Sequence, residues 1–154
     1  MKNKTYKKAY VVAVDMGYGH QRAAYPLQDI ATSPQFMGSE YHIINANRYA
    51  GIPKLDIARW EGGRKLYEKI SRMKHLPLIG EWIFSLLDYV QRIENFYPRR
   101  DLSKTTMQLR QIYRWIKKGW GKDLIEKLNK EPKPLIATFF TVAFFAEEHG
   151  FKDE

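Results

Sequence analysis

The apolar positions of this 154-residue chain follow two kinds of pattern. Nearly continuous apolar runs over residues 9–14, 41–46 and 135–140 predict three buried β-strands. Residues 21–31 lie between the first two runs and have the pattern of a helix. A strand, a helix and a second strand in this order predict a right-handed βαβ unit with parallel strands.

From residue 52 to residue 130 the pattern becomes helical, and no strong strand candidate interrupts it. Apolar positions recur at helical spacing over residues 55–70, 78–96 and 103–120, with an interruption or bend expected at Gly62–Gly63. A further short helix is predicted over residues 142–149. The fold class that follows is α/β: a three-layer domain with a parallel sheet and a long helical insertion at about residues 52–130.

The composition is that of a globular protein, with 44% hydrophobic and 14% aromatic residues. The chain has no cysteine, which excludes disulfides, thiolate catalysis and cysteine-ligated zinc. Its four histidines lack the spacing of metal ligands, so we expect no metal site. No apolar run approaches the roughly 20 residues of a membrane-spanning helix. The first run is also too short for a signal peptide, so a cytoplasmic protein is predicted.

The positive charge of the chain is concentrated in one predicted helix. The formal net charge is +9, and residues 97–122 contain eight Lys or Arg against a single acid, Asp101, a net +7. The predicted helix over residues 103–120 has one apolar face, and its other positions are crowded with basic residues. Three interpretations stay open: a face that lies on an anionic membrane, a face that grips nucleic-acid phosphates, and a solvated surface. Nucleic acid is the least favoured. The membrane interpretation involves Arg110, Arg114, Trp115, Lys117, Lys118 and Trp120.

The segment 15–24, between the first strand and the first helix, carries the candidate chemistry. Gly17 and Gly19 allow a tight turn and a close approach of the backbone to a ligand. Backbone N–H groups at the start of the helix would face an anionic or polyhydroxy ligand. His20 adds a side chain that exchanges a proton near neutral pH.

Two sequence motifs of this chain resemble a known family. The pattern Asp-x-Gly-x-Gly-His at residues 15–20 is similar to the N-terminal motif of monogalactosyldiacylglycerol synthases and of the lipid-linked N-acetylglucosaminyltransferase of peptidoglycan synthesis. Residues 134–143 resemble the later strand-to-helix segment of the same domain. Both families are glycosyltransferases of the GT-B fold. Tyr18 stands where the synthases usually have another glycine, and the resemblance covers only the first domain of the family.

The resemblance implies a Rossmann-like N-terminal half of a GT-B enzyme, in which the acceptor binds and which sits on the inner face of the membrane. By carry-over, His20 is the candidate general base, and Asp15 either orients its imidazole or, as we favour, satisfies loop N–H groups. The substrate-binding set is Gly17, Tyr18, Gly19, Arg22 and Thr138. The donor-binding domain is absent from this sequence, so we expect the chain to be inactive by itself. No cofactor is implied, because the UDP-sugar donor is a co-substrate.

Two other functions compete with this one. The first is a non-enzymatic basic α/β module that binds an anionic membrane or nucleic acid through residues 110–122. The second is a small nucleotide-binding protein that uses the glycine loop, although the Walker lysine and the dinucleotide fingerprint spacing are missing.

Overall fold

The computed structural model describes residues 8–16, 18–34, 42–73, 81–82, 85, 89 and 105–153. The chain divides into two compact units, one made of Met1–Trp60 and Tyr113–Glu154 and the other of Glu61–Ile112. The first unit contains the sheet. Residues 52–60 and 113–130, which the sequence pattern assigned to the helical insertion, belong to this first unit as well.

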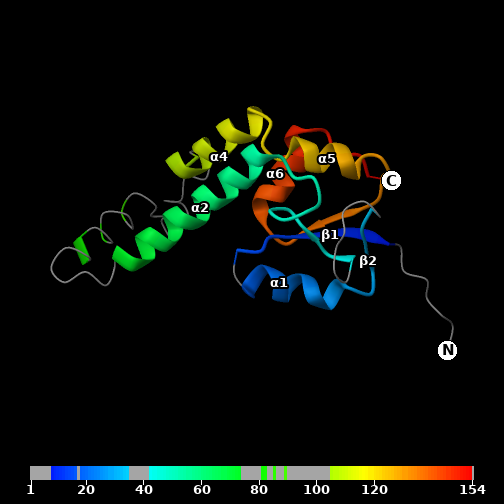
Figure 1. The fold of residues 1–154 in the computed structure, drawn as a ribbon, viewed down its shortest axis with the longest axis horizontal. Coiled ribbons are helices and arrows are strands. Elements are labelled where there is room, and N and C mark those ends of the chain that lie inside the picture. Colours follow the sequence, from blue (N-terminus) through cyan, green and yellow to red (C-terminus); the bar gives the residue numbers. More distant parts are fainter. Residues whose placement is uncertain are drawn as a thin grey trace, which may run out of the picture. The chain divides into compact units, whose positions relative to one another are not determined.

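The sheet has four short strands, all parallel to the first: β1 (Ala9–Ala13), β2 (Ala31–Thr32), β3 (Ile44–Asn45) and β4 (Leu135–Ala137) (Figure 1). Ala9 and Ala13 form their hydrogen bonds toward β2 and β3, whereas Tyr10 and Val12 form theirs toward β4. Since neighbouring residues of a strand direct their backbone groups to opposite edges, β1 is the central strand. The prediction of a mixed α/β fold with a small parallel sheet is confirmed.

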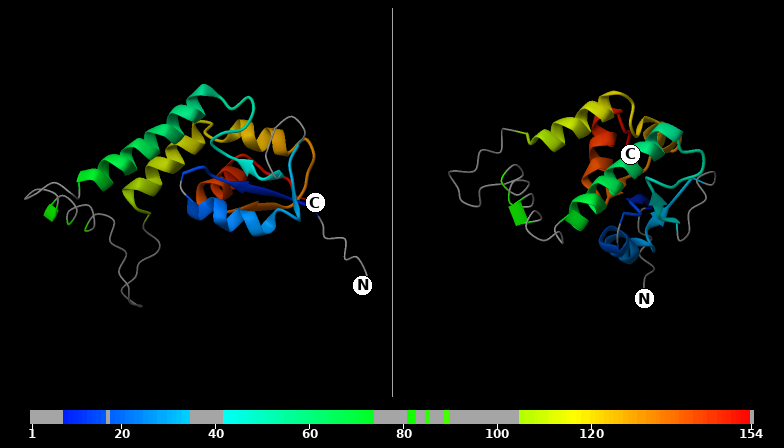
Figure 2. Two further views of the ribbon diagram at one scale, coloured as in Figure 1. Left: turned by 60° about the horizontal axis from the view of Figure 1, so that its bottom comes forward. Right: turned by 60° about the vertical axis from the view of Figure 1, so that its left-hand side comes forward.

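Helices cover both faces of this sheet. Helix α1 (Tyr18–Ala24) lies on one face, and helices α5 (Lys122–Leu128) and α6 (Phe140–Glu148) lie on the other (Figures 1 and 2). On the α1 side, Val11 and Ala13 of β1 pack with Ala24 in a cluster of buried residues. Because both faces are covered, every residue of β1 is buried.

The first helix is shorter than the pattern over residues 21–31 predicted. Helix α1 ends at Ala24 and continues as a single 3₁₀ turn, Tyr25–Leu27. Pro26 is the physical reason, because it has no backbone N–H to donate to the carbonyl of Arg22. The chain therefore turns early, and Ala31 and Thr32 extend as β2, a strand that the sequence pattern did not predict.

The second and third predicted strands are also shorter than their apolar runs. Strand β3 contains only Ile44 and Asn45, because His42 has a left-handed backbone (φ 60°) that cannot continue a strand; Tyr41 lies outside the described residues. Strand β4 ends at Ala137, since Phe139 is already the N-cap residue of α6. Thr141 lies buried within that helix.

Two further helices cross the boundary between the units. Helix α2 (Lys54–Met73) runs through Gly62 and Gly63 without a break, so the predicted interruption is absent. Helix α4 (Met107–Lys117) is shorter than the predicted 103–120 helix, because residues 105–106 are not helical and residues 118–120 form a turn. The predicted helix over residues 78–96 falls outside the described residues except for four helical positions, Glu81, Trp82, Ser85 and Tyr89.

An aromatic core in the first unit joins the start of α2 to α5 and α6. The Trp60 and Trp120 rings meet edge to face with centroids 4.8 Å apart, and both rings contact Phe145. Asp56, which is 4% exposed, accepts a hydrogen bond from the backbone N–H of Gly121 through Oδ2 (3.1 Å). This bond ties the first turn of α2 to the turn that precedes α5.

Candidate functional site

The carboxyl ends of three parallel strands bring their following residues together. Asp15 follows β1, Asn47 follows β3 and Thr138 follows β4. The Asp15 N–H donates to Asn47 Oδ1 (2.9 Å), and Asn47 Nδ2 donates back to the Asp15 carbonyl oxygen (3.1 Å). The Thr138 N–H donates to the Val12 carbonyl oxygen (3.0 Å). Open parallel sheets bind ligands at this edge, so these residues mark the candidate site.

His20 in α1 is held against the segment that follows β4. Its Nδ1 lies 3.1 Å from the carbonyl oxygen of Thr138, and its ring meets the Phe139 ring edge to face with centroids 4.7 Å apart. A carbonyl oxygen can only accept a hydrogen bond, so Nδ1 carries the proton. In the neutral imidazole, Nε2 is then the nitrogen that can accept a proton. The half-buried ring has a fixed position and a fixed tautomer, which is what a general base requires.

The Asp15 carboxylate contacts two side chains, and neither belongs to His20. Its Oδ1 accepts a hydrogen bond from Gln21 Nε2 (2.8 Å), and its Oδ2 lies 3.9 Å from Arg48 Nη1. In the part of the chain that the structure describes, the His20 ring donates its hydrogen bond to the Thr138 carbonyl oxygen, and no hydrogen bond joins the ring to Asp15. Within the described residues, the contacts of the Asp15 carboxylate therefore go to side chains, and neither to the imidazole nor to a loop N–H group.

The other expected loop residues are solvent-exposed or outside the described residues. Tyr18 is 81% exposed, and Gly19 and Arg22 are exposed as well. Gly17 lies outside the described residues. The Thr138 hydroxyl donates a hydrogen bond to the Val12 carbonyl oxygen (3.4 Å). The contribution of Thr138 to the site is therefore its backbone carbonyl, which contacts His20. Helix α1 has only seven residues, which limits the anion attraction expected from its dipole.

Asn47, Gln21 and Arg48 are site residues that reasoning from the sequence missed. Asn47 and Arg48 lie two and three residues after the end of β3 and could have been found from the rule that polar residues after parallel strands converge on one edge. Gln21 could not have been found in this way. Its hydrogen bond to Asp15 depends on which side of α1 faces the end of β1, and the sequence does not specify this.

The basic residues of α4 and of the turn that follows it are divided between the two units. Arg114, Lys117 and Lys118 are exposed in the first unit, with Trp115 half-buried beside them; Arg110 is exposed and belongs to the second unit. Trp120 is 4% exposed, and its ring packs edge to face against Trp115 with centroids 5.9 Å apart. Because Trp120 is a core residue, it cannot insert into a membrane without local unfolding. It therefore drops out of the expected membrane-binding set.

Within the described residues, no group of three or more His, Asp or Glu side chains is arranged to hold a metal ion. The described helices also include none with the length and apolar character needed to cross a bilayer.

Comparison with known proteins gives no relative from which function could be transferred. No protein family, curated protein sequence or solved structure matches this chain. The geometry around His20 therefore has to support any functional assignment.

Proposed function

We propose that this chain is the acceptor- and membrane-binding half of a GT-B glycosyltransferase with a Rossmann-like sheet. The enzyme would transfer a hexose from a UDP-sugar to the hydroxyl of a lipid acceptor at the inner face of the membrane, with the donor-binding domain supplied elsewhere in the protein. The observation that carries the proposal is the position of His20, with Nδ1 protonated by its contact to the Thr138 carbonyl (3.1 Å). An acceptor hydroxyl must lose its proton as it attacks the anomeric carbon, and Nε2 is available for this step.

The residues around His20 would define the acceptor side of the cleft. Asp15, fixed by Asn47 and Gln21, holds the strand-to-helix connection in place. Tyr18 and Arg22 are exposed in α1, two positions before and after His20, and would contact the acceptor from the ends of this helix, with Arg22 able to neutralise a phosphate.

A basic surface in the same unit, made of Arg114, Lys117 and Lys118 and called here the α4 basic cluster, would hold the protein on an anionic bilayer. Each basic residue near such a surface contributes about 1 kcal/mol, so the cluster would contribute about 3 kcal/mol. Trp115, half-buried beside these residues, is the one aromatic ring of the expected set that remains near this surface. Attraction of this kind is screened by salt over a distance of about 10 Å at 0.1 M.

Photo-crosslinking tests the acceptor site in the chain as it stands. Vesicles would carry a diacylglycerol with a diazirine near its free hydroxyl, and labelled peptides would be mapped by mass spectrometry. We expect labelling of residues 18–24 that unlabelled diacylglycerol suppresses and an equal amount of phosphatidylcholine does not. Competition by UDP alone would instead favour the nucleotide-binding function, and labelling spread evenly over the surface would contradict an acceptor site.

Two substitutions of His20 test its role once the donor-binding domain is joined to this chain. His20→Ala and His20→Asn are both expected to lower turnover by about 10²–10⁴-fold, because neither side chain can accept the proton. Asn retains an N–H that can donate to the Thr138 carbonyl, so its variant should keep the thermal stability of the parent. Unchanged turnover in His20→Asn would remove the histidine from the mechanism.

Sedimentation with anionic vesicles tests the α4 basic cluster. Reversing Arg114, Lys117 and Lys118 to Glu should abolish binding. The matched control reverses Lys54, Lys130 and Lys152, which changes the net charge equally and should lower binding only slightly. Equal binding by both triple variants would contradict a localised membrane surface. Preferential binding of the parent chain to oligonucleotides over vesicles would favour the non-enzymatic basic module.

A further inference from the structure

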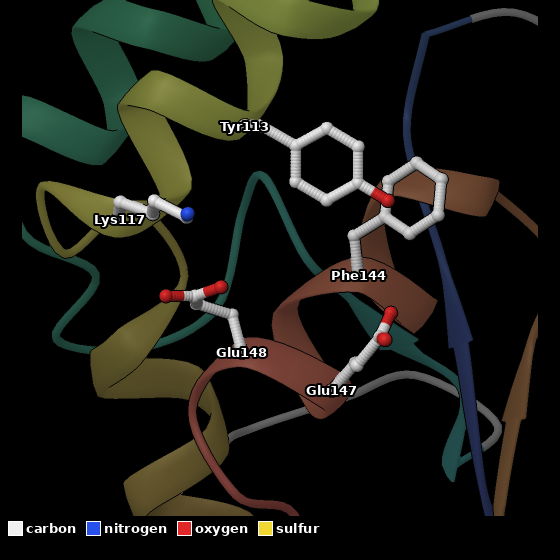
Figure 3. Close-up of a pocket in the computed structure, with 5 residues that line it drawn as sticks. All are labelled: Tyr113, Lys117, Phe144, Glu147 and Glu148. Atoms are coloured by element: carbon white, nitrogen blue, oxygen red, sulfur yellow. The ribbon is translucent and has the colours of Figure 1, made fainter. Parts of the chain in front are cut away.

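A hollow of about 330 Å³ opens on the first unit between α4 and α6, formed by side chains that take no part in the His20 site. Tyr113 and Lys117 line it from α4, one helical turn apart, and Phe144, Glu147 and Glu148 line it from α6 (Figure 3). We call it the α4–α6 pocket.

The wall of the α4–α6 pocket is aromatic. The rings of Tyr113 and Phe144 lie with centroids 4.9 Å apart and planes inclined by 32°, a tilted arrangement at a centroid distance typical of aromatic pairs. Both residues are half-buried, so part of this ring surface stays accessible from the pocket. Such a surface accepts short alkyl groups, and a ring face also attracts a cation.

Side chains of both charge signs line the same pocket, and they do not form ion pairs with one another within the described residues. Lys117, Glu147 and Glu148 are all exposed. Within the described residues, neither glutamate forms an ion pair with Lys117. Even if the side chains moved to form such a pair, an exposed ion pair is worth about 0–1 kcal/mol, so a ligand could displace it.

We propose that the α4–α6 pocket binds a zwitterion that joins a primary ammonium to a phosphate diester, the chemistry of a glycerophosphoethanolamine group. The ammonium donates to the Glu147 carboxylate, which lies on the side of the Tyr113 and Phe144 rings, whereas the Glu148 carboxylate is directed to the other side of the pocket (Figure 3). Lys117 is the partner for the phosphate, and the two-carbon linker packs against the aromatic pair.

The net charge of the pocket selects this class of ligand over related ones. Two glutamates and one lysine give a formal charge of −1. A doubly charged phosphate monoester without an amine would be repelled, whereas a zwitterion of zero net charge is not. A quaternary ammonium could approach the ring faces but cannot donate a hydrogen bond to the Glu147 carboxylate, so ethanolamine is favoured over choline.

This proposal does not rest on the glycosyltransferase assignment, because it uses none of the residues around His20. The same group occurs as a membrane-lipid headgroup and as a free soluble molecule, and both sources present the same chemistry to the pocket.

Titration of the full chain with sn-glycero-3-phosphoethanolamine, followed by amide chemical shifts, tests the site. We expect saturable shifts at Tyr113, Lys117 and Glu148 with a Kd below about 1 mM, which corresponds to roughly 4 kcal/mol. Ethanolamine alone and glycerol 3-phosphate alone should each bind at least about tenfold more weakly. Equal binding of glycerol 3-phosphate would show an ordinary anion contact to Lys117 and overturn the proposal.

Variants of similar size distinguish ligand binding in this pocket from binding of the α4 basic cluster to a membrane. The double variant Glu147→Gln/Glu148→Gln should lose at least about tenfold in affinity for the zwitterion, whereas Glu126→Gln, at an exposed glutamate of α5, should not change it. Unchanged affinity in the double variant would refute the site. Reversing Arg114 and Lys118 should weaken binding to anionic vesicles and leave binding of the soluble zwitterion intact, so the two proposals can fail independently.

Vesicles then identify the source of the ligand. If the lipid headgroup reaches the pocket, phosphatidylethanolamine should increase binding over phosphatidylcholine at equal anionic-lipid content, and Glu147→Gln/Glu148→Gln should abolish the increase. No increase, together with retained binding of the soluble molecule, assigns the pocket to a free ligand.

Discussion

Substitution of Gly121 by Ala should be one of the most destabilising single-methyl changes in this protein. Gly121 is buried in the turn before α5 and has a left-handed backbone with φ +80°. A Cβ atom at this position would overlap the ring of Phe145, which is fully buried. The ring cannot move aside easily, since Trp60 and Trp120 pack against it with centroids 6.0 Å and 5.1 Å away.

The expected loss of stability has two parts. A left-handed conformation costs an L-residue about 1–2 kcal/mol. Overpacking of a filled core adds about 1–3 kcal/mol. The sum is about 2–5 kcal/mol, a large share of the total stability of about 5–15 kcal/mol for a typical domain. For a chain of this size it corresponds to a fall of about 4–20 °C in Tm.

Gly119→Ala is the matched control. Gly119 also has a left-handed backbone, with φ +91°, but a Cβ there would have no heavy atom within 4 Å. It should therefore cost only the backbone part, about 1–2 kcal/mol. Denaturant unfolding followed by tryptophan fluorescence measures both. Equal losses in the two variants would refute the argument that contact with Phe145 dominates at Gly121.

Three further predictions concern other parts of the chain. Asn47→Ala removes both hydrogen bonds to the Asp15 backbone, so hydrogen exchange of the Asp15 amide should quicken by roughly tenfold or more. Asn129→Ala removes two comparable bonds, to Gly150 and Lys152, and should leave that amide unchanged; equal effects would contradict a local role for Asn47. Burial and the hydrogen bond from its hydroxyl to Asp123 (2.7 Å) raise the pKa of Tyr49, so the folded protein keeps this proton where the unfolded chain, with a pKa of about 10, loses it. Stability should therefore fall as pH rises above about 10, and denaturant unfolding between pH 8 and 11 should show a smaller fall in Tyr49→Phe; an equal fall would contradict the assignment. Gly62→Ala, at an open exposed position inside α2, should stabilise by about 0.5–1 kcal/mol because alanine loses less conformational freedom, and a lower Tm would contradict an unstrained helix there.

The sequence predicted the parallel α/β core because that core is encoded by local patterns. An unbroken apolar run such as residues 9–14 is compatible with few environments other than a strand buried on both faces. The position of His20 in the first helix after this strand likewise follows from chain order. Element ends were predicted less well, since they depend on single residues such as Pro26 and His42, whose backbone restrictions override the apolar pattern.

The sequence by itself determined three of the parallel strands, the histidine at the strand-to-helix connection and the concentration of basic residues over residues 110–118. Tertiary structure decided what these residues contact. The partner of the His20 ring is a backbone carbonyl 118 positions away, and no side-chain pattern predicts which carbonyl faces a ring. The sequence pattern allowed Trp120 to lie either in the core or at a membrane surface. The structure buries it, because Trp60 and Phe145 from other segments pack against its ring. The α4–α6 pocket exists because Tyr113 of α4 meets Phe144 of α6 across the intervening α5 and β4, and such a contact depends on the whole fold rather than on any local pattern.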